Sequence, residues 1–155
     1  MNLYQIRNIL AQGKKLIELP LRVTFYARVS TDHEEQLNSL ENQVMYFENY
    51  IKSQDNWTFV PGYVDEGISG TSVNKRDNFL KMINDAKVGK FNLILTKEIS
   101  RFSRNTVDSI KYTQELLANN VGVFFLNDNI NTFDSDSALR LTIMSSIAQD
   151  EIRKL

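Results

Sequence analysis

A serine and three arginines are the residues of this sequence best suited to chemistry. Ser30 stands two residues after Arg28 at the end of an apolar run, and Arg101 and Arg104 stand three residues apart much later in the chain. Guanidinium groups bind phosphate oxygens bidentately and stay charged at all accessible pH. Around a phosphoryl centre they would stabilise the extra charge of its pentacovalent transition state without a metal ion. These residues therefore favour attack by the Ser30 hydroxyl on a phosphate ester, provided that the fold brings them together.

Each of these residues also has a purely structural explanation. The segment after Ser30 has the pattern of a helix start, with Thr31 or Asp32 as the N-cap, and hydroxyl residues are common at such turns for capping alone. Arg101 and Arg104 would point the same way if one helical turn contained both. They would equally suit a helix start, where solvated arginines pair with nearby acids. The spacing alone leaves both explanations open.

Apolar segments that alternate with amphipathic helices would position these residues. The predicted strands cover residues 21–29, 57–64, 91–96 and 121–126. The predicted helices cover residues 32–54, 76–88, 106–119 and 137–155. This alternation predicts an α/β fold, a three-layer domain with a mainly parallel central sheet, because crossovers between parallel strands are right-handed. The carboxyl edge of that sheet would then carry Arg28, Ser30, Asp65, Arg101 and Arg104.

Some segments carry finer expectations. Pro61-Gly62 interrupts the second strand and predicts a kink or bulge near a sheet edge. The glycines and hydroxyl residues of 65–72, and the polar residues of 127–136, predict loops. In the helix over 76–88, the side chains expected to face inward are Phe79, Leu80, Ile83 and Ala86.

The two ends of the chain differ from its centre. Residues 1–20 have mostly helical apolar spacing that ends at Pro20, so we expect an N-terminal helical extension that packs on the domain or mediates contacts. Residues 21–136 would form the domain itself. Residues 137–155 predict a helix that stops without a C-cap, which suggests the start of a long helix that continues in a larger parent protein.

The composition is that of an ordinary globular protein. With 155 residues, of which 42% are hydrophobic and 24% charged, the chain is long enough for one domain. It has no apolar stretch long enough to span a membrane and no secretory signal, so we expect a cytoplasmic protein. The formal net charge of −1 argues against a surface coated in basic residues, although it leaves room for a local basic site.

The sequence lacks the residues of the common metal and thiol sites. It has no cysteine and a single histidine, His33, in a capping segment flanked by acids. Disulfides, thiolate nucleophiles and cysteine-ligated zinc are therefore excluded, and His33 is expected to be a solvated surface residue. We expect no metal and no cofactor.

The segment Tyr26-Ala27-Arg28-Val29-Ser30-Thr31 resembles the signature of the serine site-specific recombinases, the resolvase and invertase family. Further matches follow in family order: Gln43, then Asp65 to Thr71, Arg76, Ser100 to Asn105, and Ala148 to Glu151. The resemblance covers about residues 21–155. The versions of the motifs after the second and third strands are more similar to those of the large serine recombinases, the transposon and phage integrases.

The resemblance implies a role for each matching residue. Ser30 would be the nucleophile, and the scissile phosphate would be bound by Arg28, Arg101 and Arg104. The supporting residues would be Tyr26, Gln43, Asp65, Arg76 and Glu151. The family often has aspartate at the position of Ser100, so the resemblance leaves an acidic group near the arginines unaccounted for.

The resemblance also implies a reaction and partners. Four subunits would cut both strands of double-stranded DNA, each Ser30 forming an ester with a 5′ phosphate. After strand exchange, the free 3′ hydroxyls would religate the DNA without ATP, which would integrate or excise a mobile element. The protein would act as a homodimer and a homotetramer, and most of its DNA affinity would come from carboxyl-terminal regions beyond this chain.

Two alternatives belong to other functional classes. A noncatalytic relative could serve as an assembly or regulatory module, but such a relative would be free to lose Ser30 and its arginines, which this sequence retains. A flavodoxin-like or receiver domain would have a similar fold. A receiver, however, needs clustered acids for magnesium, whereas arginines and hydroxyls dominate the predicted rim.

Overall fold

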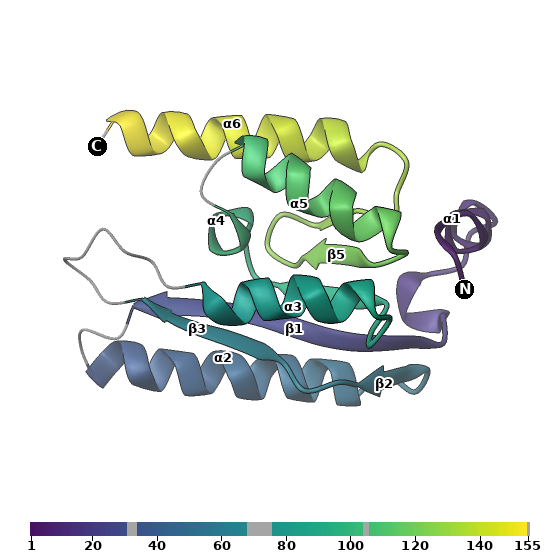
Figure 1. Ribbon diagram of the computed structural model, residues 1–155, viewed down its shortest axis with the longest axis horizontal. Helices are drawn as coiled ribbons and strands as arrows, with labels where there is room; N and C mark the ends of the chain where they lie inside the picture. The colour runs from purple at the N-terminus through teal and green to yellow at the C-terminus, as the bar shows by residue number, and fades with distance from the viewer. Residues whose placement is uncertain (31–33, 68–75, 104–105, 155) are drawn as a thin grey trace.

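A six-stranded sheet organises the molecule, with strand order β2-β1-β4-β5-β6 and with β3 also paired to β1 (Figure 1). The computed structural model describes residues 1–30, 34–67, 76–103 and 106–154. Within these ranges it describes only the backbone of residues 29–30, 34–39, 67, 100–101, 106, 145 and 148–154. His33, Ser69, Thr71 and Arg104 therefore lie outside the described residues.

The longest strand, β1 (Leu21–Ser30), lies in the middle of the sheet. It pairs in parallel with β4 (Leu93–Thr96), which pairs in parallel with β5 (Gly122–Phe125). The short β6 (Ile130–Asn131) lies antiparallel to β5, within the segment that the sequence predicts as a loop. Every residue of β4 is buried, as expected for a parallel strand covered on both faces. The sheet is thus mainly parallel, which confirms the predicted fold class.

The predicted second strand is divided into two. The strands β2 (Trp57–Phe59) and β3 (Tyr63–Gly67) both pair in parallel with β1 on the same side, at the edge of the sheet. Between them, the side-chain hydroxyl of Thr24 donates a hydrogen bond to the Pro61 carbonyl at 3.0 Å. A Cβ at Gly62 would overlap the Phe25 ring, so only glycine fits this break. The predicted kink is confirmed, but β3 continues to Gly67, so residues 65–67 are strand and not loop.

Helices cover both faces of the sheet (Figure 1). On one face lies α2 (Glu34–Lys52), whose Phe47 ring stacks on Phe25 of β1 at 5.1 Å between centroids. On the other face lie α3 (Asp77–Lys87), α4 (Ile99–Phe102), α5 (Thr106–Ala118) and α6 (Ser137–Lys154). Two apolar clusters, one on each face, form the core. Among the described helices, none is long and apolar enough to cross a membrane.

The N-terminal extension packs onto the domain. It consists of α1 (Leu3–Ala11) and a short 3₁₀ helix (Leu16–Glu18). Ile6 is fully buried in the cluster that α2 shares with β1. The Arg7 Nε donates a hydrogen bond to the Phe133 carbonyl at 2.8 Å, and the Trp57 indole donates one to the Leu16 carbonyl at 3.2 Å. The extension is helical, as the sequence predicts, and it contributes to the core.

One inward position of α3 differs from the expectation. Leu80 is 51% exposed, and Met82 is fully buried instead. The buried residues Phe79, Met82, Ile83 and Ala86 form an i, i+3, i+4, i+7 stripe. Leu80 lies about 100° around the helix from Phe79, so it faces solvent once Phe79 points into the core.

Candidate active site

The carboxyl end of β1 and its neighbour β3 form the base of the site. The register pairs Arg28 with Asp65 and Ser30 with Gly67. Tyr26 and Arg28 are two residues apart in β1, so their side chains leave the sheet on the same face, the one covered by α3. Tyr26 is fully buried there and Arg28 is half-buried. The strand therefore carries these side chains from the core towards the edge that ends at Ser30.

The Asp65 carboxylate is the centre of a buried hydrogen-bond network. It is 4% exposed and accepts a hydrogen bond from the Tyr26 hydroxyl at 2.8 Å. It also accepts the backbone N–H groups of Asn78 and Phe79, each at 3.0 Å. These two groups belong to the first turn of α3, whose own N-cap residue, Arg76, makes no side-chain capping bond. Asp65 thus caps α3 from the neighbouring strand, and a negative charge at a helix N-terminus is favourable.

Arg76 connects this network to α4. Its guanidinium carbon lies 3.9 Å from the centroid of the Phe79 ring and 5.6 Å from that of Tyr26. Its Nη2 donates a hydrogen bond to the carbonyl of Phe102, the residue that follows Arg101. The structure therefore brings Tyr26, Asp65 and Arg76 together, and it links them to the helix that carries Arg101.

The environment of Tyr26 disfavours the ionised phenol. Burial raises the pKa of Tyr26 well above its ordinary value near 10. The Arg76 guanidinium opposes this shift, and the hydrogen bond to the Asp65 carboxylate adds to it. The hydroxyl is thus held in its protonated, donating form, which suits a structural support and not an acid or base.

This shift predicts a loss of stability at alkaline pH. Because the pKa of Tyr26 is higher in the folded state, the unfolded chain releases the phenolic proton first as pH rises above about 10. The free energy of unfolding should then fall by about 1.4 kcal/mol per pH unit on account of this residue. In Tyr26→Phe this contribution should disappear, whereas Tyr4→Phe, which removes an exposed phenol, should keep the wild-type slope. Urea unfolding between about pH 9 and 11 measures both slopes, and equal slopes in Tyr26→Phe and wild type would contradict the prediction.

Of the two later arginines, Arg101 lies in a short described helix. Arg101 belongs to α4, but α4 ends at Phe102, and the backbone of Ser103 is extended, with φ −148° and ψ 160°. Arg104 lies outside the described residues, so how its side chain lies relative to that of Arg101 stays a prediction. The last residue of α4, Phe102, is fully buried and packs edge-on against Phe79 and Phe125.

The remaining predicted residues lie in different places. Gln43 is half-buried in the middle of α2, on the opposite face of the sheet from the Tyr26 ring. Glu151 lies near the end of α6, and only its backbone is described. Gln43 is thus not part of the Tyr26, Asp65 and Arg76 network.

One residue that the sequence does not single out contacts this site. The Asp128 carboxylate accepts the backbone N–H of Ile99, the first residue of α4, at 3.1 Å. Asp128 lies in the turn between β5 and β6. The available signal was its place three residues beyond β5, on the edge where the predicted site residues gather.

The described part of the site offers guanidinium groups and not a cluster of metal ligands. Among the residues that the structure describes, no group of three or more histidine, cysteine, aspartate or glutamate side chains could hold a metal ion. The donors that the structure describes near the end of β1 are instead the guanidinium of Arg28 and that of Arg76. Such a set can bind anionic oxygens.

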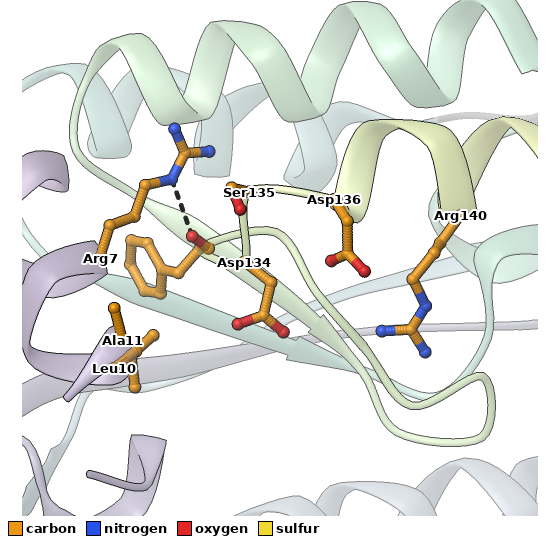
Figure 2. A pocket seen from close by; sticks show the side chains of 8 residues that line it. Arg7, Leu10, Ala11, Asp134, Ser135, Asp136 and Arg140 are labelled. Atoms are coloured by element: carbon orange, nitrogen blue, oxygen red, sulfur yellow. Dashed lines mark hydrogen bonds between the residues drawn. The ribbon is translucent and has the colours of Figure 1, made fainter. Parts of the chain in front are cut away.

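A cavity of about 350 Å³ lies at the other end of the molecule, between α1 and the connection from β6 to α6 (Figures 1 and 2). It is lined by charged side chains of both signs, including Arg7, Asp134, Asp136 and Arg140. Burial and the nearby Asp136 raise the pKa of Asp134, while the two arginines oppose the shift. Because the opposite charges balance, the cavity has no preference for an anion, and it lies away from Ser30.

Comparisons with known proteins agree with this architecture. The family model described as the N-terminal domain of resolvases matches residues 23–155. The Tn3 transposon resolvase of Escherichia coli is 31% identical over 137 residues, which cover 87% of this chain and 66% of that protein. The chain thus spans just under two thirds of the length of these curated relatives.

Two solved structures share the fold. The crystal structure of a resolvase family site-specific recombinase from Streptococcus pneumoniae aligns with a TM-score of 0.69 and 30% identity, covering 86% of this chain and 91% of that one. The N-terminal catalytic domain of TP901-1 integrase aligns with a TM-score of 0.53 and 27% identity, covering 85% and 97%. The family match over most of the chain, together with these structures, shows that the chain belongs to the resolvase family of serine recombinases and has the fold of their catalytic domains.

Proposed function

We propose that this chain is the catalytic domain of a site-specific DNA recombinase in which Ser30 is the nucleophile. The Ser30 oxygen forms a bond to a DNA phosphorus, and the bond from that phosphorus to the 3′ oxygen breaks. The serine proton leaves to a base, and the 3′ oxygen takes up a proton. The product is a 5′ phosphoserine ester, which a 3′ hydroxyl later attacks in reverse, so the phosphodiester energy is conserved and no ATP is needed.

The network around Asp65 is the observation that carries this proposal. It joins β1, β3 and α3, and Arg76 extends it to α4. Because α4 also packs against β1, the backbone of Arg101 is held beside the strand that contains Arg28 and ends at Ser30. A rigid base of this kind lets guanidinium groups stabilise a phosphorane transition state without reorganisation at the moment of reaction. Arg104 would complete the set.

Exposed apolar residues support a role for a second copy of the chain. Along α6, Leu139, Ile143 and Ile147 are spaced four residues apart and are 66%, 50% and 50% exposed. Residues at this spacing share one face of a helix. A partner subunit packed on this face would cover the stripe, in line with a dimer that pairs into a tetramer on two DNA sites. Such a protein would act in the cytoplasm, on the integration or excision of a mobile element.

The reaction can be tested by isolating its intermediate. The full-length protein that contains this domain is incubated with DNA from the ends of its own element, in EDTA, and the complex is denatured and digested with protease and nuclease. We expect a nucleotide joined through a 5′ phosphate to the peptide that contains Ser30. Linkage to another residue, or stable assembly on DNA with no covalent product, would overturn the proposal; the latter would indicate a noncatalytic module.

A further inference from the structure

The single turn of α4 depends on its neighbours for its position. It contains only Ile99 to Phe102, and an isolated helical turn has almost no stability of its own. Its buried side is held by Phe102, whose ring centroid lies 5.2 Å from that of Phe79 and 5.5 Å from that of Phe125. These contacts fix one side of the turn. The orientation of its N-terminal end requires a second anchor.

Asp128 provides that second anchor. Its Oδ2 accepts the N–H of Ile99 at 3.1 Å from a partly buried position. The N-cap residue of α4, Glu98, makes no side-chain capping bond to the turn. Its carboxylate instead accepts a hydrogen bond from the Asn127 side chain at 3.3 Å. Asp128 thus supplies, from 29 residues further along the chain, the charge-assisted bond that an N-cap residue would normally give.

The turn that carries Asp128 is itself held firmly. Its backbone continues the pairing of the neighbouring strands, with the Leu126 N–H donating to the Thr96 carbonyl at 3.0 Å and the Asn127 N–H to the Lys97 carbonyl at 2.9 Å. On its other side, Arg140 of α6 donates to the Asn129 carbonyl at 2.9 Å. The carboxylate is therefore presented from a fixed support and can determine where α4 begins.

We propose that Asp128 is a positioning residue for the DNA cleavage reaction, because it fixes the helical turn from which Arg101 reaches the scissile phosphate. This inference rests on the proposed function. Asp128 acts through the backbone of Ile99 and does not touch the DNA.

The test compares Asp128→Ala with Asp128→Asn in the full-length protein, on a supercoiled plasmid that carries the element-end DNA. Asparagine retains a side-chain oxygen that can accept the Ile99 N–H, whereas alanine does not. We expect Asp128→Ala to lower the single-turnover rate of covalent complex formation roughly 10- to 100-fold, with DNA affinity unchanged, because a small misplacement of a catalytic group has effects of that size. Asp128→Asn should stay close to the wild-type rate. Asp55→Ala, at an exposed acid before β2, is the matched control and should behave as wild type.

Amide hydrogen exchange on residues 1–155 tests whether the effect is local. In Asp128→Ala the amides of Ile99 and Ser103 should exchange faster, while those of Leu95 and Val123 in the sheet should not change. Faster exchange throughout would overturn the positioning role, as would a wild-type cleavage rate in Asp128→Ala or an equally slow Asp128→Asn. These outcomes do not contradict the proposed function. The proposed function fails only if the wild-type protein does not form the adduct through Ser30.

Discussion

Replacing Ser30 with alanine should abolish the covalent protein–DNA complex while leaving DNA binding unchanged. Alanine lacks the side-chain oxygen, which is the only protein atom that the proposed reaction joins to phosphorus. It is close to serine in size, so the end of β1 should keep its structure. Loss of a nucleophile lowers turnover by on the order of 10⁴-fold or more in enzymes that form covalent intermediates, so no adduct should be detectable. The measurement is a denaturing gel of the full-length protein with end-labelled element DNA, beside a binding assay on the same DNA.

The control for this experiment is a variant that lacks the other hydroxyl side chains that could act as the nucleophile. Ser69, Thr71 and Ser72 lie in the segment between β3 and α3 and are the other candidate nucleophiles near the predicted rim. The triple substitution of these residues by alanine should still give the adduct. If Ser30→Ala forms the adduct and the triple variant does not, the nucleophile is in that segment and the assignment of Ser30 is wrong.

The fold could be predicted from the sequence because its main signals are local. The strand β4 is a short apolar run buried on both faces, and the apolar residues of α2 recur every three or four positions. Even the break between β2 and β3 has a local signal in Pro61-Gly62, since proline cannot donate to the ladder and glycine allows the Phe25 ring to approach. These features depend little on distant parts of the chain.

The errors arise where a distant contact decides the outcome. Phe79 packs edge-on against both Tyr26 and Tyr112, at 5.2 and 5.0 Å between ring centroids, and this fixes the rotation of α3 so that Met82 and not Leu80 is buried. The spacing of apolar residues in α3 is compatible with burial of either Leu80 or Met82. Likewise, nothing near Arg101 in sequence indicates the place of α4, whose last residue, Phe102, packs against rings of two distant elements, Phe79 of α3 and Phe125 of β5.

The internal connections of the candidate site could not be predicted from the sequence. The sequence places Asp65 at the rim, yet its partners are the Tyr26 hydroxyl and two backbone N–H groups of α3. Backbone groups carry no sequence signal, so the capping of α3 by Asp65 and of α4 by Asp128 becomes visible only in the fold. Each of these two carboxylates accepts one or two backbone N–H groups at the start of a helix, from an adjacent strand or turn.

Asp65 should therefore be the most sensitive supporting residue, and Asp65→Ala should destabilise the domain by several kcal/mol. The substitution leaves two buried donors, the Tyr26 hydroxyl and the Phe79 N–H, and one partly buried donor, the Asn78 N–H, without their acceptor. Each unsatisfied buried donor costs about 1–3 kcal/mol. A loss of that total size is a large part of the roughly 5–15 kcal/mol by which domains are stable. Urea unfolding of residues 1–155, followed by circular dichroism near neutral pH, measures the change.

Tyr26→Phe is the matched control, because it removes one donor and leaves Asp65 bonded to both N–H groups of α3. It should cost only about 1 kcal/mol, the usual net value of one hydrogen bond. The difference between the two variants then measures what Asp65 contributes through the start of α3. The stability cost of Asp65→Asn should lie between those of Tyr26→Phe and Asp65→Ala. The asparagine oxygen can still accept a hydrogen bond, but its NH₂ group would face another donor. If Asp65→Ala costs no more than Tyr26→Phe, the carboxylate does not hold the start of α3.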